Sequence, residues 1–387
     1  MLLLGSMLGG DKSLMAPPDD WDFADLGMRD TQYLTHFFHH WTAKFIPQIP
    51  GRVIEIYGRP GGAVLDPFMG CGTTLVEAAL RGHPAYGLDI SPLAHKIARA
   101  KTRPVDDAAV ESVIAWLDRQ KRRWEAARQT YGGPREDEAA DETLFSGSER
   151  WFRPDVARAL RTIRDRFAHL EPDTRNFVEV GLSDLLKGMS NARMDTTVPT
   201  LPPTPVYLDK KHYHRPVDNR SRRINPHARL SAQLKRMHRA LQEFRRRAGA
   251  TPCQPILADA RRLSEHVPPV QVAVTSPPYW DAQNYQKLHS LSFRVLGLPE
   301  PGAAEIGRVK PNYLADMDQV IAELCQVLRG VFALVIGESK NGEHAAVRDL
   351  CLKHGMKEIE TIRRQVVNHA FFAKAVKAEY IYLFTTE

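Results

Sequence analysis

Cysteine is scarce in this sequence, and its four residues are far apart. Cys71, Cys253, Cys325 and Cys351 include no CxxC pair. Disulfide frameworks and structural zinc sites need clustered cysteines, so this spacing argues against both. We therefore expect a protein of the reducing cytoplasm.

Long hydrophobic runs are also missing. No apolar stretch approaches the roughly 20 residues that a membrane-spanning helix needs, so we expect no membrane partner. The start, MLLLGSMLGG, is apolar but lacks a basic region and is followed by acidic residues, which makes it a poor signal peptide. Hydrophobic residues at 43% and charged residues at 26% are ordinary for a soluble globular protein. Residues 1–30 carry little signal and are expected to be partly disordered.

Acidic residues are few between residues 201 and 250. This segment holds thirteen Lys or Arg against three acidic residues, a net charge of +10, whereas the whole chain carries +7. One basic segment on a near-neutral body is typical of a protein that binds a polyanion. A solvated basic helix is the alternative. The loop at 190–226 lies either along a phosphate backbone or acts as a linker, and its candidate DNA-binding residues are Lys210, Lys211, Arg215, Arg220, Arg222 and Arg223.

Residues 271–280, QVAVTSPPYW, read as a short buried strand that ends in a rigid loop. Pro277 and Pro278 fix the backbone and remove two donors. The Ser276 hydroxyl and the Pro277 carbonyl are left as acceptors, with Tyr279 as an aromatic face beside them. Such a loop suits a flat molecule with an NH2 group, because open α/β sheets bind ligands at the carboxyl ends of strands. A Pro-Pro turn that merely closes a core strand remains the alternative.

Residues 63–80, AVLDPFMGCGTTLVEAAL, read as a strand, a glycine-bearing turn and an amphipathic helix. Gly70 and Gly72 let the backbone approach a ligand closely, and free N–H groups at the helix start favour an anionic group. A second strand at 85–90 ends in Asp89, nineteen residues after Gly70. An acidic residue at that offset commonly binds ribose hydroxyls, so the order of these pieces favours a ligand that carries adenosine.

Strand signals recur later in the chain, at 255–260, 271–275, 331–337, 359–368 and 379–385. With the first two strands they predict a doubly wound α/β domain with a seven-stranded, mostly parallel sheet. Between them, residues 105–250 show three apolar stripes at helical spacing. We expect a catalytic domain at 31–104 and 251–387 and a helical, basic insertion at 105–250 that is the candidate target-recognition region.

Two other features point to chemistry that we do not favour. His36, His39 and His40 suggest a metal site, but adjacent histidines on a helix cannot face one ion and no carboxylate is spaced to complete it, so we expect no metal. The segment Pro252-Cys253-Gln254 is similar to the nucleophile loop of C5-cytosine methyltransferases. Cys253, however, is expected to precede a strand, and the Ser276 loop already occupies the end of the catalytic strand.

Five motifs together resemble those of S-adenosylmethionine-dependent DNA amino-methyltransferases: KFIP at 44–47, DPFMGCGTT at 66–74, GLDI at 87–90, LADA at 257–260 and TSPPYW at 275–280. The resemblance covers 31–103 and 251–387 and implies a class I, Rossmann-like methyltransferase fold. TSPPY with serine first resembles the N4-cytosine branch, while the related N6-adenine enzymes more often have aspartate or asparagine there. Cys71 departs from the family pattern, and we expect it to be tolerated because mainly backbone is used at that point.

The resemblance implies that S-adenosylmethionine binds to Lys44, Phe45, Asp66, Phe68, Gly70, Gly72, Thr73, Thr74, Asp89, Ile90 and Asp259. The glycine turn and the KFIP element would enclose its methionine part. Asp89 would bind the ribose, while Ile90 and Asp259 would contact adenine. The base site would be formed by Ser276, Pro277, Pro278 and Tyr279.

The activity that the resemblance implies is site-specific methylation of the N4 amine of cytosine in double-stranded DNA, after the base has been flipped out of the helix. The expected setting is the nucleoid, in a restriction-modification or epigenetic role, with any restriction endonuclease on a separate chain. The alternatives are N6-adenine methylation of DNA, methylation of an RNA base amine, and a non-catalytic DNA-binding relative. The target sequence and the choice between monomer and dimer stay open.

Overall fold

The computed structural model of the protein describes residues 21–42, 44–131, 151–192, 196, 198–201, 224–278, 285–300, 306, 310–339, 342–366 and 378–387. Its strands are β1 (Val64–Asp66), β2 (Ala85–Asp89), β3 (Cys253–Leu257), β4 (Val270–Thr275), β5 (Leu328–Gly337), β6 (Lys357–Gln365) and β7 (Ala378–Thr385). They form one seven-stranded sheet in the order β3-β2-β1-β4-β5-β7-β6. The predicted fold class is confirmed: the sheet is parallel from β3 to β5, and β7 runs antiparallel to both of its neighbours.

The strand order reverses between β1 and β4. From β1 the chain moves outward to β2 and β3, and it then returns to place β4 on the other side of β1. Val64 pairs with Ala85 of β2 and with Val272 of β4, so the carboxyl ends of these strands lie at one edge of the sheet. Loops diverge at such a reversal and leave a crevice, which is where open α/β sheets bind ligands.

Both faces of the sheet are covered. Val64, Val272 and Val274 face one apolar core, while Leu65 and Ala273 face the other. This alternation explains why the inner strands read as continuous apolar runs, because parallel strands are buried on both sides. The first face is covered by α2 (Gln48–Tyr57), α3 (Thr73–Leu80) and α4 (Pro92–Thr102), and the second by η4 (Ala260–Glu265), α11 (Tyr313–Val327) and α12 (Glu343–Lys353).

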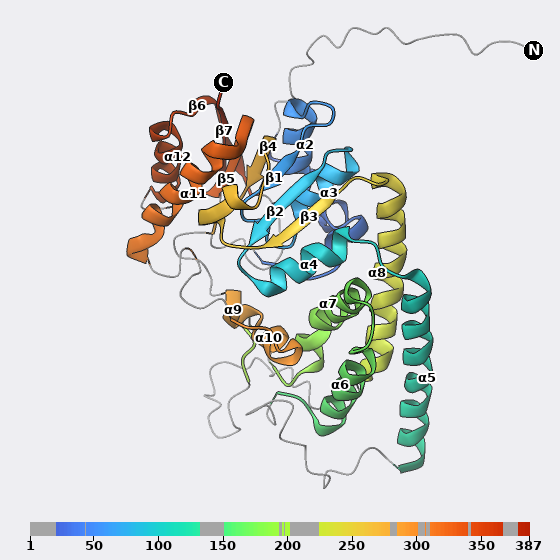
Figure 1. Cartoon of the computed structure of the whole chain (residues 1–387). Coiled ribbons are helices and arrows are strands. Elements are labelled where there is room, and N and C mark those ends of the chain that lie inside the picture. The colour runs from blue at the N-terminus through green and yellow to red at the C-terminus, as the bar shows by residue number, and fades with distance from the viewer. Residues whose placement is uncertain are drawn as a thin grey trace, which may run out of the picture.

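A group of helices extends from the first face (Figure 1). It contains α5 (Asp107–Tyr131), α6 (Pro154–Phe167), α7 (Pro172–Met189) and α8 (Pro226–Ala248). Buried Leu117, Leu160, Phe177 and Leu234 belong to the same apolar core as Leu75 of α3. The helical part is therefore packed firmly onto the sheet, although the predicted domain boundaries at 104 and 250 stay a prediction.

The remaining elements are short: α1 (Met28–Thr31), η1 (Leu34–Phe37), α9 (Tyr285–Leu288), α10 (Ser290–Leu296) and η6 (Lys310–Asn312). Within the described part of the chain, none of the helices combines the length and the apolar character that crossing a bilayer requires.

Some predicted elements were wrong in detail. The strand expected at 255–260 begins at Cys253 and ends at Leu257, so Cys253 lies in β3 and does not precede it. Asp259 instead caps the following turn of 3-10 helix, where its side chain accepts a hydrogen bond from Arg261 N. The predictions also omitted α4, α7 and α12. In α7, buried residues occur on most sides of the helix, so it lacks the single apolar stripe that the prediction relied on.

Candidate functional site

The turn between β1 and α3 depends on two glycines with positive φ. Gly70 has φ of +47° and Gly72, the N-cap of α3, has φ of +78°. A Cβ at Gly70 would lie 3.0 Å from Nε1 of Trp41, and one at Gly72 would lie 2.9 Å from Cβ of Ala98. Both the backbone conformation and the close packing therefore require glycine. The turn directs backbone N–H groups and the start of α3 toward the edge of the sheet.

Asp66 connects this turn with the loop that follows β4. Its side chain is 1% exposed. One oxygen accepts hydrogen bonds from Thr275 Oγ1 at 2.6 Å and Phe68 N at 3.1 Å, and the other accepts one from Thr74 Oγ1 at 2.6 Å. Burial raises the pKa of Asp66 to about 6, although these hydrogen bonds act in the opposite direction. Asp66 thus holds the ends of β1, β4 and α3 together, a role that the motif alone did not reveal.

Asp89 is placed by the same kind of local bonding. One of its carboxylate oxygens accepts a hydrogen bond from Gly70 N at 3.0 Å, and the other accepts one from Ser91 N at 2.8 Å. These two hydrogen bonds fix the position of the Asp89 carboxylate relative to the glycine turn. A carboxylate oxygen can accept more than one hydrogen bond, so the group can still receive donors from a ligand.

These residues border one cavity at the crevice, with about 910 Å³ of empty space that is partly open to solvent. Nine of the eleven residues predicted for the cofactor line it: Lys44, Phe45, Asp66, Phe68, Gly70, Thr73, Asp89, Ile90 and Asp259. Gly72 and Thr74 do not line it: Gly72 shapes the turn, and the Thr74 hydroxyl donates a hydrogen bond to Asp66. From the predicted base site, Ser276 and Pro278 line the same cavity, and Pro277 is buried beside them. Tyr279 lies outside the described residues.

The cavity wall also contains residues that were not predicted from the sequence. Pro67, Met69, Cys71, Ser91, Ala258 and Ala260 line it, and each of them is adjacent in the chain to a predicted residue. Trp41 and Ile306 come from elsewhere. The ring of Trp41 stacks on His289, with centroids 4.7 Å apart and an interplanar angle of 7°. Trp41 stands three residues before the KFIP motif, next to the histidines that suggested a metal, and that proximity was the only available signal.

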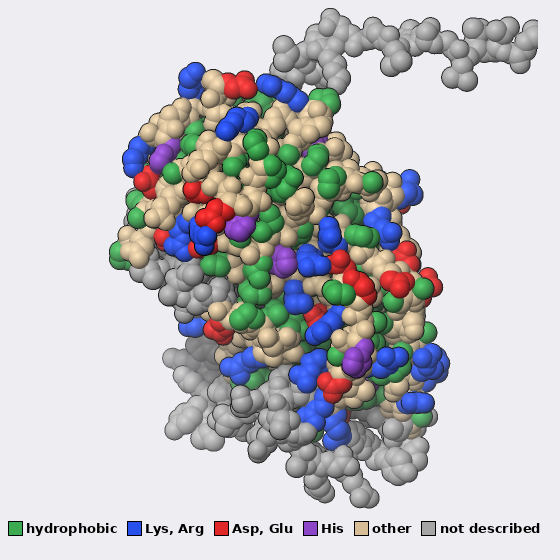
Figure 2. Space-filling model, viewed as in Figure 1, with side chains coloured by type: hydrophobic (Ala, Val, Ile, Leu, Met, Phe, Trp, Pro, Cys, Tyr) green, Lys and Arg blue, Asp and Glu red, His purple; other side chains and the backbone are tan. Residues whose placement is uncertain are grey.

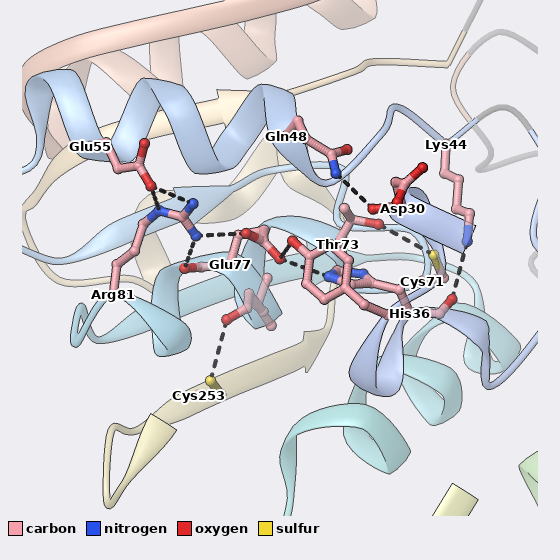
Figure 3. A network of polar contacts seen from close by, with 12 residues as sticks. Asp30, His36, Lys44, Gln48, Glu55, Cys71, Thr73, Glu77, Arg81 and Cys253 are labelled. Atoms are coloured by element: carbon pink, nitrogen blue, oxygen red, sulfur yellow. Dashed lines mark hydrogen bonds and ion pairs between the residues drawn. The ribbon is translucent and has the colours of Figure 1, made fainter. Parts of the chain in front are cut away.

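The segment that carries Trp41 and Lys44 is anchored to α3 through Glu77 (Figure 3). Tyr33 Oη donates to Oε1 of Glu77 at 2.6 Å, His36 Nε2 lies 2.8 Å from the same oxygen, and Arg81 pairs with Oε2 at 2.6 Å. Lys44 Nζ donates to the His36 carbonyl at 3.2 Å. Burial lowers the pKa of His36 to about 4, so its ring is neutral at physiological pH despite the nearby carboxylate.

Asp259 forms an ion pair inside the site. Its carboxylate lies 2.6 Å from Nη2 of Arg261, which also pairs with Asp316 of α11 at 2.7 Å. Burial acts to raise the pKa of Asp259, but the Arg261 guanidinium has the larger effect. The pKa is therefore below its ordinary value, and the carboxylate stays ionised. The side chain predicted to contact adenine is therefore rigidly held at the cavity wall.

Basic side chains are numerous on the helical part, where Figure 2 shows them over the lower half of the visible face. Many are paired, for example Lys235 with Asp118 at 2.7 Å and Arg245 with Asp107 at 3.3 Å. The six residues predicted to bind DNA, at positions 210–223, all lie outside the described residues. Among the described residues, no three His, Cys, Asp or Glu side chains are arranged to hold a metal ion. His39 instead contacts the Ser183 hydroxyl at 2.9 Å.

Comparison with known proteins agrees with the resemblance to DNA amino-methyltransferases that the motifs indicate. A family model described as DNA methylase, which covers N6- and N4-type enzymes, matches residues 17–100. The Type II methyltransferase M.MvaI of Kocuria varians is 30% identical over 168 residues, which are 42% of this chain and 36% of that protein. The Type II methyltransferase M.MjaII of Methanocaldococcus jannaschii is 34% identical over 97 residues, 24% of this chain and 18% of that protein. The chain thus matches about a third or less of the length of these curated relatives.

Among solved structures, TrmN from Thermus thermophilus matches with 12% sequence identity and a TM-score of 0.36, over 88% of this chain and 49% of that one. The rRNA methyltransferase aviRa from Streptomyces viridochromogenes matches with 10% identity and a TM-score of 0.35, over 91% of this chain and 89% of that one.

Proposed function

We propose that this chain is a member of the DNA amino-methyltransferase family that it resembles and transfers a methyl group from S-adenosylmethionine to an exocyclic base amine in double-stranded DNA. One observation carries the proposal. A single cavity is lined both by the glycine turn with Asp89, which we call the first wall, and by Ser276 with Pro278, which we call the second wall. A donor and an acceptor molecule bound to these two walls would meet inside it, and positioning of this kind supplies much of a transfer enzyme's rate.

The residues of the first wall fit S-adenosylmethionine. At Gly70 the positive φ disfavours a side chain, and a Cβ there would crowd Trp41. The N–H groups at the start of α3 suit a carboxylate. Asp89 is oriented by Gly70 N and Ser91 N, and it would accept hydrogen bonds from the ribose hydroxyls. When bound, the cofactor supplies an electrophilic methyl group on a sulfonium, and the protein supplies the position.

The second wall fits a flat base that bears an amine. The lone pair of such an amine is delocalised into the ring, so the amine is a poor nucleophile. Ser276 Oγ and the Pro277 carbonyl would each accept a hydrogen bond from one of its two N–H groups. These bonds would favour a pyramidal nitrogen whose lone pair is directed at the methyl group. Pro277 and Pro278 keep this shelf rigid. Extrusion of the base from the duplex costs a few kcal/mol, and stacking on Tyr279 would offset part of it.

We infer cytosine N4 as the target because serine precedes the two prolines, as in the N4 branch that the motif resembles. N6-adenine is the second candidate, since the matching family model covers both types. We further propose that the basic segment at 201–250 contacts DNA phosphates, through the residues between 210 and 223, and that any restriction endonuclease acting at the same site is a separate protein. Salt would weaken such binding steeply, because each phosphate contact releases counterions.

Product analysis tests the proposal. The protein is produced in a host without DNA methylation, and the host DNA is digested to nucleosides and analysed by mass spectrometry. N4-methyldeoxycytidine is the expected product, and N6-methyldeoxyadenosine would favour the second candidate. Absence of both, from a protein that binds S-adenosylmethionine in a calorimetric titration, would contradict DNA amine methylation.

The Ser276→Ala variant tests the role of the shelf. We expect a drop in kcat of about 10²-fold, the scale of a lost transition-state hydrogen bond, with cofactor affinity unchanged. The matched control is Ser264→Ala, because the Ser264 hydroxyl bonds to Glu323 and does not line the cavity. Equal losses of turnover and of cofactor affinity at Ser276 would contradict its assignment to the base site.

A further inference from the structure

Cys71 lies in the cavity wall, between the two left-handed glycines of the turn. It lines the cavity but is 1% exposed, so only a small molecule that passes along the cavity can reach its sulfur. It stands two residues before the first residue of α3, and its Sγ lies 3.6 Å from the Thr73 hydroxyl. The start of a helix carries a partial positive charge, which favours an ionised thiol.

Lys101 brings a full positive charge to the same place. It lies in the last turn of α4, is 0% exposed, and is among the largest fully buried side chains of the described residues. By distance its Nζ has no hydrogen-bond partner within the part of the chain that the structure describes, although the Cys71 side chain is near enough to interact with it as one. A buried ammonium group without a compensating anion is costly. The groups that act electrostatically on Lys101 are the Cys71 thiol, which stabilises its charge, and Lys44, which opposes it.

The geometry points to a thiolate–ammonium pair between Cys71 and Lys101, and we propose that this pair makes Cys71 a site of modification by small peroxides that enter the cavity. Cys71 and Lys101 are both buried at the start of α3, with half-buried Lys44 acting on both, and ionisation of the thiol supplies the anion that Lys101 lacks. The charge of Lys101 also acts on His36 and His39. Burial lowers the pKa of both rings and keeps them uncharged, so neither histidine is a charged partner for Lys101 or for the thiolate.

The four cysteines provide an internal comparison. Burial acts to raise the pKa of the Cys71 thiol, but Lys101 and Lys44 lower it below its ordinary value. Burial raises the pKa of Cys253 to about 12 and also raises those of Cys351 and Cys325. Cys325 is the only half-buried one of the four, and the others are buried. Exposure alone would therefore make Cys325 the most reactive thiol, whereas ionisation favours Cys71.

The chemical step needs only the thiolate and a hydroperoxide. A sulfur lone pair attacks one peroxide oxygen, the S–O bond forms as the O–O bond breaks, and hydroxide leaves. The sulfur is oxidised by two electrons to a sulfenic acid and the peroxide is reduced. The added oxygen would occupy space where the methionine part of the cofactor is expected. This last consequence rests on the proposed function, while the reactivity of the thiol does not.

Competitive labelling tests the proposal on the full chain. The native protein is treated briefly with iodoacetamide at neutral pH, and the modified fraction of each cysteine is measured by peptide mass spectrometry. We expect Cys71 to react about tenfold faster than Cys325, because the thiolate is the nucleophile. Hydrogen peroxide followed by a sulfenic-acid probe should mark the same residue. Labelling of Cys71 that is no faster than that of Cys325 would overturn the proposal.

The Lys101→Met variant tests the pair itself, and it should abolish the preference for Cys71 while the circular dichroism spectrum is retained. If this variant does not fold, the ultraviolet absorbance of thiolate is titrated in the native protein and in Cys71→Ser. Loss of a thiolate signal at neutral pH in Cys71→Ser supports the pair, and superimposable titrations refute it. S-adenosylmethionine should slow the labelling of Cys71. Selective labelling without such protection would contradict the proposed cofactor site and leave the thiol site standing.

Discussion

The buried carboxylate of Asp66 gives a prediction with a calculable size. It is 1% exposed, and burial raises its pKa from 3.8 to about 6. The folded protein therefore holds a proton more tightly than the unfolded chain between these two values. Stability must fall as the pH rises through this window, because the folded state binds more protons there. The shift of about two pKa units corresponds to about 3 kcal/mol of unfolding free energy, lost in full above pH 6.

An Asp66→Asn variant isolates this contribution. Asparagine has nearly the same shape, can still accept a hydrogen bond from Thr275 or Thr74, and does not ionise. The difference in unfolding free energy between native protein and variant cancels the titration of every other group. Between about pH 4.5 and pH 7.5, we expect the native protein to lose about 2 kcal/mol of stability relative to the variant. Urea unfolding followed by circular dichroism at the two pH values measures it.

A second variant checks the cause. Thr275→Val removes the 2.6 Å hydrogen bond that lowers the pKa of Asp66. The pKa should rise further and extend the loss of stability to higher pH. If the difference between native protein and Asp66→Asn is the same at both pH values, burial does not control this carboxyl group and the reasoning fails.

Three further changes test other contacts of the site. Gly72→Ala places a side chain at a φ of +78° and 2.9 Å from Ala98 Cβ, so it should cost about 1–3 kcal/mol of stability; an unchanged melting temperature would contradict this. Asp89→Asn should weaken S-adenosylmethionine binding by at least about tenfold, since hydrogen bonds to a charged acceptor are worth about 1.5–3 kcal/mol; calorimetry with equal affinities would refute it. Glu77→Gln leaves Glu55 as the only carboxylate paired with Arg81 among the described residues and should cost about 2–4 kcal/mol in urea unfolding; a smaller loss than that of Glu55→Gln would show that the anchor is not Glu77.

Local patterns predicted much of the fold and the site. The strands and turns near Gly70, Asp89 and Ser276 follow from short-range rules: apolar runs, glycine at a tight turn and proline at a strand end. Nine of the eleven predicted cofactor residues line one cavity for that reason. The boundary at Asp259 was wrong because its carboxylate caps a helical turn, and this competition between backbone and side chain is decided only in three dimensions.

The amino-acid sequence by itself predicted the strands, the glycine turn, the resemblance to a methyltransferase family and the residues of the two walls of the cavity, because each depends on residues close together in the chain. Tertiary structure decided which distant groups meet. It brought Asp66 against Thr275, Trp41 against His289, and Lys101 against Cys71. Burial and long-range charge set the protonation of these groups, and neither can be read from spacing along the chain.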